Sequence, residues 1–155
     1  MELFLVQHAE SKPREEDPER SLTKAGDAAA RRMADWAAQA GVKISQIRHS
    51  GKLRAAQTAS LMAERLAPNA GVQSTQGINP LDDPTPLAEE LRSQQESLML
   101  VGHLPFLSRL AGVLLAGDPE RSVVNFENAG IVCLRRMEGE WILRWAMSPQ
   151  LLSSD

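Results

Sequence analysis

The chain has 155 residues, of which 43% are hydrophobic and 24% charged, and its formal net charge is −3. These values are typical of one globular domain that can bury a core without disulfides. A negative net charge with no run of Lys and Arg does not favour binding to nucleic acid or to an acidic membrane surface. We therefore expect a single domain over residues 1–155.

Cysteine use and the N-terminal residues bear on the cellular compartment. Cys133, the one cysteine, lies in the apolar run at 131–134, which predicts a buried thiol and excludes a disulfide framework within the chain. A single thiol fits a reducing cytoplasm. The apolar run at residues 3–6 is too short to span a membrane and lacks the flanking features of a signal peptide. We therefore expect a cytoplasmic protein.

Strand-like and helix-like segments alternate along the chain, which favours an α/β fold with a mostly parallel sheet. The apolar run at 3–6 predicts a strand that is buried on both faces. The polar stretch at 11–20 predicts a mobile loop. Thr23 can then cap a helix over residues 24–40, and Gly41 suits the end of that helix.

The middle of the chain continues this alternation. A second strand is expected within residues 42–48, followed by a helix over 52–66. Turn-forming residues fill 77–86, and a short helix is expected over 87–95. Residues 97–101 form another continuous apolar run, which predicts a second fully buried strand.

The C-terminal part begins with a helix and ends with a hairpin. Pro105 suits the first turn of a helix that runs to about residue 116. Two strand-like runs, at 131–136 and 141–145, flank the turn-like residues 137–140. This pattern predicts two antiparallel strands joined by a tight turn.

Chemistry-bearing side chains gather at the ends of the predicted strands. His8 and His103 each follow an apolar strand, and His49 and Ser50 follow a third. Arg54 lies in the first turn of the next helix. Sites in parallel sheets form at the carboxyl ends of the strands, and helix N-termini attract anions. Two imidazoles, a guanidinium and helix N–H groups suit a phosphoryl group.

Four segments resemble, in order, the motifs of the histidine phosphatase superfamily. They are VQHA at residues 6–9 (family RHG or RHA), RSLTKAG at 20–26 (R-P-L-T-x-x-G), HSGKLRAAQT at 49–58 (S-[PG]-x-x-R-A-x-Q-T) and VGHLP at 101–105 (V-G-H-N-P). The chain length and the C-terminal hairpin also resemble the short SixA-like branch. The resemblance implies a three-layer α/β/α domain of the phosphoglycerate mutase-like fold over residues 1–155.

The resemblance also implies a covalent mechanism that needs no metal and no cofactor. Neutral His8 attacks phosphorus through one ring nitrogen, while the other nitrogen keeps its proton on a hydrogen-bond acceptor. Arg54 holds phosphoryl oxygens with its planar fork, and His103 stabilises the same developing charge. Arg20 matches a basic residue of the SixA-like branch, and it is either a phosphate ligand or a salt-bridge residue.

Gln7 departs from the family pattern, because the family has arginine next to the nucleophile. Glutamine donates hydrogen bonds but is shorter and uncharged. Three outcomes stay open: a slow phosphatase, an enzyme with a shifted substrate, or a phosphoryl-binding module without turnover. Lys12, Arg14 and Lys52 are the candidates that can replace the missing charge.

The general acid, the substrate and the partner are less defined. Glu10, Asp82 and Asp83 are the carboxylates that can serve as the acid. The SixA-like build implies phosphohistidine on a protein, such as a histidine-phosphotransfer domain, with a small phosphomonoester as the alternative. No metal-ligand spacing and no nucleotide-binding loop is present in the sequence. His49 is expected to hydrogen-bond at a strand end, and Ser50 to cap a helix.

Overall fold

A six-stranded mixed sheet forms the centre of the computed structural model, which describes residues 1–152. The strands lie in the order β3-β2-β4-β1-β5-β6. The first four are parallel to one another, and β5 and β6 are antiparallel additions beside β1. The strands are β1 (Glu2–Gln7), β2 (Gln46–His49), β3 (Val72–Ser74), β4 (Leu98–Gly102), β5 (Ile131–Met137) and β6 (Glu140–Met147).

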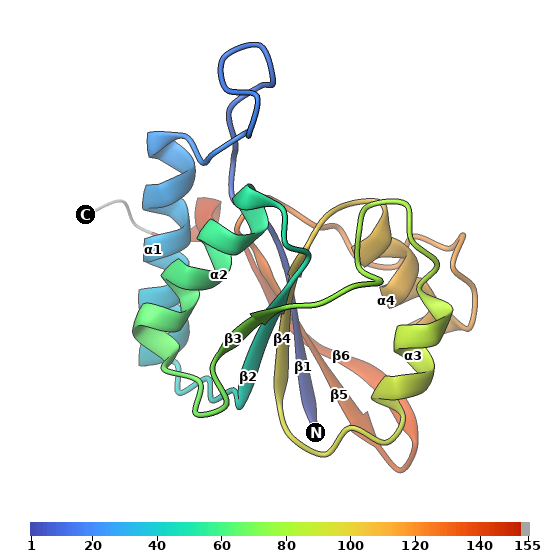
Figure 1. Cartoon of the computed structure of the whole chain (residues 1–155). Coiled ribbons are helices and arrows are strands. Elements are labelled where there is room, and N and C mark those ends of the chain that lie inside the picture. Colours follow the sequence, from blue (N-terminus) through green and yellow to red (C-terminus); the bar gives the residue numbers. More distant parts are fainter. Residues whose placement is uncertain (153–155) are drawn as a thin grey trace.

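Helices cover both faces of this sheet (Figure 1). α1 (Lys24–Gln39) and α2 (Leu53–Leu66) lie together on one face, and α3 (Thr85–Leu91) and α4 (Phe106–Ala116) lie on the other. A short 3-10 helix, η1 (Pro149–Leu151), follows β6. The predicted single-domain, three-layer α/β/α arrangement with a mostly parallel sheet is confirmed. Within residues 1–152, every helix is too short or too polar to span a lipid bilayer.

Burial explains why the central strands read as continuous apolar runs. All five residues of β4 are buried, because helices cover the sheet on both sides. Along β1, successive side chains alternate between the two layers. Phe4 and Val6 pack with α1 and α2, whereas Leu3 and Leu5 pack with α3 and α4. Cys133 is buried in the first of these cores, as its apolar surroundings predict.

The predicted boundaries differ from the observed ones where burial is weak. β3 is absent from the sequence prediction, because its three residues are exposed and carry no apolar pattern. The strand expected within 42–48 spans Gln46–His49 and so ends one residue further along, and the helix expected over 87–95 lies earlier, at Thr85–Leu91. The stretch 11–20 is a loop, and it is closed at its base by a β-bridge between Ser11 and Leu22.

The start of α1 packs directly on the residues that follow β1. Thr23 caps the helix by accepting a hydrogen bond from the Gly26 N–H (2.9 Å), as predicted. A Cβ added to Gly26 would overlap the backbone carbonyl oxygen of Glu10. Glycine at this position therefore lets the helix lie against the chain segment that carries His8.

Gly26→Ala is expected to destabilise the protein by about 2 kcal/mol, because the new methyl group must push the helix away from Glu10. Denaturant unfolding measures the change in the free energy of unfolding. Ala28→Gly, at an exposed position of the same helix, is the control and is expected to cost about 1 kcal/mol through helix propensity alone. A Gly26→Ala variant as stable as the parent would contradict this packing argument.

Candidate active site

The ends of β1, β4 and β2 bring two histidines and a serine together. β1 and β4 are in register with Gln7 opposite Gly102, and the His8 N–H donates to the Gly102 carbonyl (3.0 Å). This pairing places the imidazoles of His8 and His103 side by side, with ring centroids 5.1 Å apart. β2 lies on the other side of β4, so that Ser50 reaches the same place.

The hydrogen bonds of His8 define its tautomer. Its Nδ1 lies 2.8 Å from the carbonyl oxygen of Ala9. A carbonyl oxygen only accepts hydrogen bonds, so Nδ1 carries the proton and Nε2 keeps its lone pair. Burial lowers the pKa of His8, with smaller contributions from the positive charges of Arg54 and Arg20, against the raising effect of the Ala9 hydrogen bond. His8 is thus a neutral imidazole with a free ring nitrogen.

Two polar side chains hold the backbone around His8. The Ala9 N–H donates to the hydroxyl of Thr58 (3.0 Å), and this hydroxyl donates to the Arg54 carbonyl (2.8 Å). Thr58 is fully buried, so each of these hydrogen bonds is shielded from water. From the other side, the Asn128 amide donates to the His8 carbonyl (2.8 Å). The position of the imidazole is thereby fixed from α2 and from the segment before β5.

His103 is almost completely buried and is kept neutral. Only 2% of its surface is exposed. Burial lowers its pKa to about 3, with further lowering by the neighbouring His8, Arg54 and Lys52. Its Nε2 lies 2.6 Å from the Ser50 hydroxyl, whereas its Nδ1 is buried with no partner among residues 1–152. An unpaired buried ring nitrogen is costly, and a phosphoryl oxygen can satisfy it once Nδ1 carries the proton.

Arg54 and Arg20 lie close enough to lower the pKa of both imidazoles, and the charge of Arg14 acts on Arg54. Arg54, in the first turn of α2, has a buried Nε with no hydrogen bond within residues 1–152. Burial lowers its pKa, and so do the charges of Arg20 and Arg14. Arg20 donates to the Lys12 carbonyl and the Ser11 hydroxyl, at 3.2 Å each.

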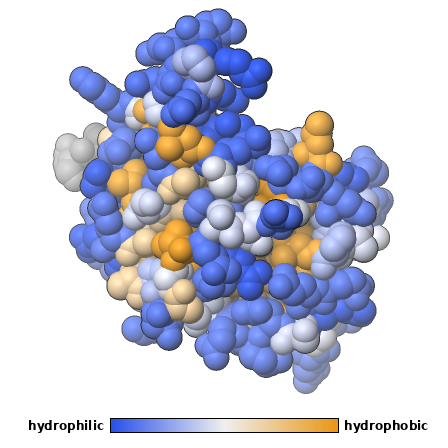
Figure 2. Space-filling view, in the orientation of Figure 1, coloured by the Kyte–Doolittle hydropathy of each residue, from blue (hydrophilic) through white to orange (hydrophobic). Residues whose placement is uncertain are grey.

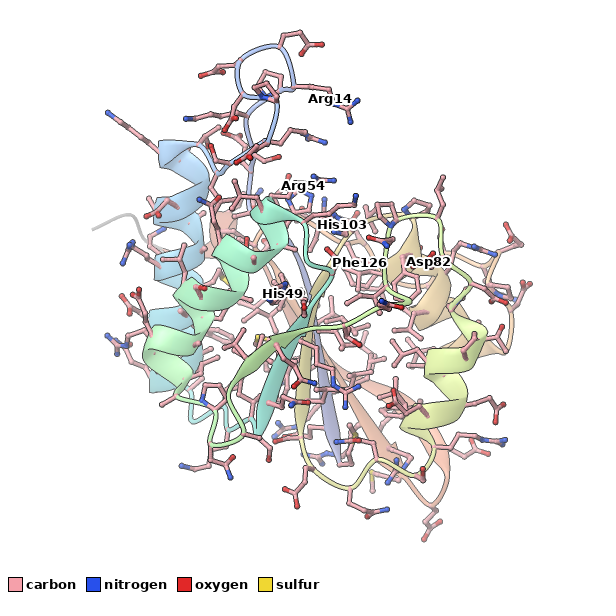
Figure 3. The ribbon with its side chains drawn as sticks, viewed as in Figure 1. Arg14, His49, Arg54, Asp82, His103 and Phe126 are labelled. Atoms are coloured by element: carbon pink, nitrogen blue, oxygen red, sulfur yellow. The ribbon has the colours of Figure 1, made fainter. Side chains whose placement is uncertain are left out.

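Arg14 extends from the loop above Arg54 and His103 (Figure 3). This loop stands at the top of the molecule and is mainly hydrophilic (Figure 2). Within residues 1–152, Arg14, Arg20 and Arg54 form no ion pair with a carboxylate, so the salt-bridge alternative for Arg20 has no support there. Unpaired guanidinium groups around neutral imidazoles form a site for an anion.

Gln7 lies beside this site and faces a separate hollow of about 520 Å³. Glu10, Arg32, Leu104 and Phe126 contribute to the same hollow. The side-chain amide of Gln7 forms no hydrogen bond within residues 1–152, and the Gln7 Oε1 is buried without a partner there. The position that holds arginine in the family motif therefore supplies no charge here.

The remaining candidates have local roles. The Nδ1 of His49 accepts the Gly51 N–H (3.1 Å), which confirms its expected position at a strand end. Glu10 accepts from the Thr23 hydroxyl (2.7 Å), Asp82 from the Asn79 N–H (2.8 Å) and Asp83 from the Thr85 N–H (3.0 Å). Each carboxylate thus holds a turn or a helix start. Across residues 1–152, no three His, Cys, Asp or Glu side chains are grouped to hold a metal ion.

Solved structures share this fold, although sequence comparison finds no match. No model of a protein family matches the sequence, and no curated protein matches it. A solved structure of the protein histidine phosphatase SixA with tungstate superposes with a TM-score of 0.86 and 25% identity, covering 97% of this chain and 98% of that chain. The chain thus has the fold of the histidine phosphatase superfamily.

Other solved structures superpose over similar lengths. A SixA structure from Agrobacterium tumefaciens matches at 23% identity and a TM-score of 0.76, covering 96% of this chain and 97% of that one. A phosphoserine phosphatase from Entamoeba histolytica matches at 17% identity and a TM-score of 0.72, covering 95% and 96%. The resemblance to the SixA-like histidine phosphatases that the four sequence motifs indicate is confirmed.

Ser50 and Asn128 hydrogen-bond to the two histidines, and Thr58 bonds to the neighbouring Ala9. These three residues are not among those that the sequence analysis assigns to the site. Ser50 does not occupy the predicted cap position, because Lys52 precedes α2 and the Ser50 hydroxyl turns to His103. Ser50 and Thr58 lie within the third motif, which is the signal that could have identified them. Asn128 lies in no motif.

Thr58→Val is expected to weaken phosphate binding, because it removes the hydroxyl that binds the Ala9 N–H and so loosens the residue whose carbonyl orients His8. The Ala9 N–H is then left unpaired in the core. The free energy of unfolding should fall by about 1–3 kcal/mol. Calorimetric titration with tungstate and denaturant unfolding measure the two effects. Thr58→Ser retains the hydroxyl and should restore tungstate affinity. Equal affinities for the valine and serine variants would refute this positioning role.

The neutral, buried His103 predicts a loss of stability in acid. The pKa of His103 in the folded protein, about 3, lies below the usual value of about 6.5. The contribution of the neutral imidazole to the free energy of unfolding is therefore complete above pH 6.5 and is lost as the pH falls. One proton linked in this way costs about 1.4 kcal/mol per pH unit, or about 2 kcal/mol between pH 7 and pH 5. Urea unfolding at both pH values measures it, and His103→Gln should remove this part of the pH dependence. An unchanged pH dependence in the variant would contradict the burial argument.

Proposed function

We propose that this chain is a phosphatase that transfers a phosphoryl group to His8 and then to water. The observation that carries the proposal is the state of His8. Its Nδ1 is held on the Ala9 carbonyl, and its Nε2 has no partner among residues 1–152, beside Arg20 and Arg54. A neutral imidazole with one free lone pair is the form that attacks phosphorus.

The proposed reaction has two displacements. In the first, the Nε2 lone pair forms a P–N bond while the bond from phosphorus to the leaving group breaks with its electron pair. Arg54, Arg20 and His103 stabilise the charge on the phosphoryl oxygens during this transfer. In the second, water attacks phosphorus and releases a proton to solvent, the P–N bond breaks with its electron pair returning to His8 Nε2, and inorganic phosphate leaves. No metal and no cofactor takes part.

We propose a phosphohistidine on a protein as the substrate. The similar solved structures include a protein histidine phosphatase, and the match covers nearly all of both chains. Phosphohistidine has a reactive P–N bond, so its leaving imidazole needs little help from a general acid. This suits a site in which Glu10, Asp82 and Asp83 each hold a turn or helix start. A cytoplasmic location belongs to the same proposal.

A second candidate function is phosphoryl binding without turnover. Gln7 favours it, because its side chain is uncharged and makes no hydrogen bond within residues 1–152. A charged arginine contact in phosphoryl transfer can be worth about 10³–10⁵ in rate. Arg14 and Lys52 are the loop and helix-start residues that can offset this loss, because their charges act on Arg54 and His103 respectively.

The variants Gln7→Arg and His8→Ala distinguish the phosphatase from the phosphoryl-binding module. Hydrolysis of p-nitrophenyl phosphate and of a phosphohistidine protein is measured in the presence of a chelator. We expect wild-type turnover, its loss in His8→Ala, and a gain of at least tenfold in Gln7→Arg. Gln73→Arg, at an exposed position of β3, controls for the added charge alone.

Each remaining outcome decides against one part of the proposal. A wild-type protein without phosphatase activity, together with an active Gln7→Arg variant, would establish the binding module. Hydrolysis of p-nitrophenyl phosphate without any action on the phosphohistidine protein would refute the protein substrate. Turnover that persists in His8→Ala would refute the covalent mechanism.

A further inference from the structure

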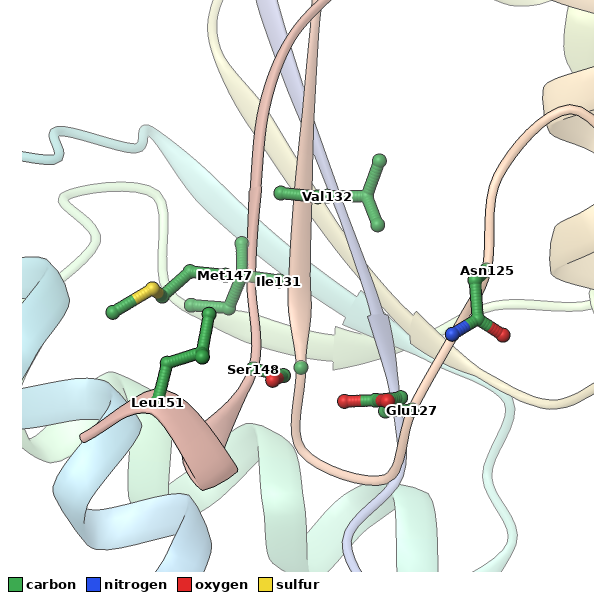
Figure 4. Close-up of a pocket in the computed structure, with 9 residues that line it drawn as sticks. Asn125, Glu127, Ile131, Val132, Met147, Ser148 and Leu151 are labelled. Carbon is green, nitrogen blue, oxygen red and sulfur yellow. The ribbon is translucent and has the colours of Figure 1, made fainter.

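A second hollow, of about 170 Å³, lies between the segment 125–130 and the end of β6 (Figure 4). Three polar side chains line it: those of Asn125, Glu127 and Ser148. Its apolar walls come from Ile131, Val132, Met147 and Leu151. A Cβ added to Gly130 would lie 3.3 Å from the Met147 carbonyl and 3.7 Å from the Glu127 Cβ, so the Glu127 side chain starts close to the end of β6.

The polar groups of this hollow are unused by the protein. Among residues 1–152, the side chains of Asn125, Glu127 and Ser148 have no hydrogen-bond partner, and Glu127 has no ion-pair partner. A carboxylate, an amide oxygen and a hydroxyl all accept hydrogen bonds. The hollow therefore offers several acceptors and one negative charge, next to apolar walls.

A lysine side chain matches this set of groups. Its ammonium donates three hydrogen bonds and carries one positive charge, and its four-carbon stem packs on apolar surface. A guanidinium is planar and presents five donors in a fixed fork, which suits a flat double acceptor better than a small hollow with a single carboxylate. We propose that this hollow binds a lysine side chain of the phosphorylated protein substrate. This inference rests on the proposed function.

The two residues that follow Glu127 hydrogen-bond to the backbone around the proposed nucleophile. Asn128, next to Glu127, donates to the His8 carbonyl, and the Ala129 N–H donates to the Gln7 carbonyl (2.9 Å). Glu127 also lines the larger hollow that Gln7 and Leu104 border. A chain segment that brings its phosphohistidine to His8 can therefore place a nearby lysine against Glu127.

A lysine scan of a phosphohistidine peptide tests the proposal. A neutral peptide and eight variants, each with one lysine within four residues of the phosphohistidine, are compared by kcat/KM. We expect roughly a fivefold gain, through KM, at one or two positions. The gain should vanish with norleucine and in Glu127→Gln, but persist in Glu89→Gln, an exposed site on α3. No preferred position, or a preference that survives Glu127→Gln, would overturn the proposal.

A binding experiment separates this proposal from the proposed function, because it needs no turnover. Titration with n-butylammonium is followed by the backbone amide NMR shifts of Gly130 and Ser148, with n-pentanol as the uncharged match. We expect a saturable shift with the amine that is lost in Glu127→Gln and absent with n-pentanol. Saturation without any phosphatase turnover would support the pocket while the proposed function fails. Equal shifts in wild type and Glu127→Gln would refute the ammonium site whatever the turnover.

Discussion

The hydrogen bond between the Nδ1 of His8 and the Ala9 carbonyl is the interaction on which the site depends. It fixes which ring nitrogen holds the proton and turns the other toward the anion site. The Ala9 N–H is itself bonded to the buried Thr58 hydroxyl. The orientation of the imidazole is thereby linked to a side chain of α2, 49 residues further along the chain.

Burial and unpaired positive charge act in the same direction on the two histidines, because both lower the pKa of the imidazoles. Burial removes the protons from His8 and His103, which makes the imidazoles neutral. The arginines remain charged and have no carboxylate partner within residues 1–152, so the field of Arg20 and Arg54 further disfavours protonation of the histidines. An arriving phosphoryl group replaces the missing carboxylates and relieves the mutual repulsion of the guanidinium groups.

The sequence predicts the layers of the fold and the two histidines at strand ends, because buried strands and helix stripes leave strong apolar patterns. It does not predict β3, which is short and exposed, nor the contact of Ser50 with His103. That contact exists because β2 lies next to β4, and strand order follows from long-range packing that one sequence does not display. Asn128 escapes prediction for the same reason, since 120 residues separate it from His8.

The loop at residues 11–22 carries Arg14 and Arg20 on a molecule whose formal net charge is −3. The same loop also carries Glu15, Glu16, Asp17 and Glu19, so its charged side chains sum to −1. Seen from a distance, the acidic side chains offset the cations, and the loop does not draw an anionic partner toward the site. The guanidinium groups therefore act on a phosphoryl group at short range, inside the Debye length of about 10 Å at 0.1 M salt.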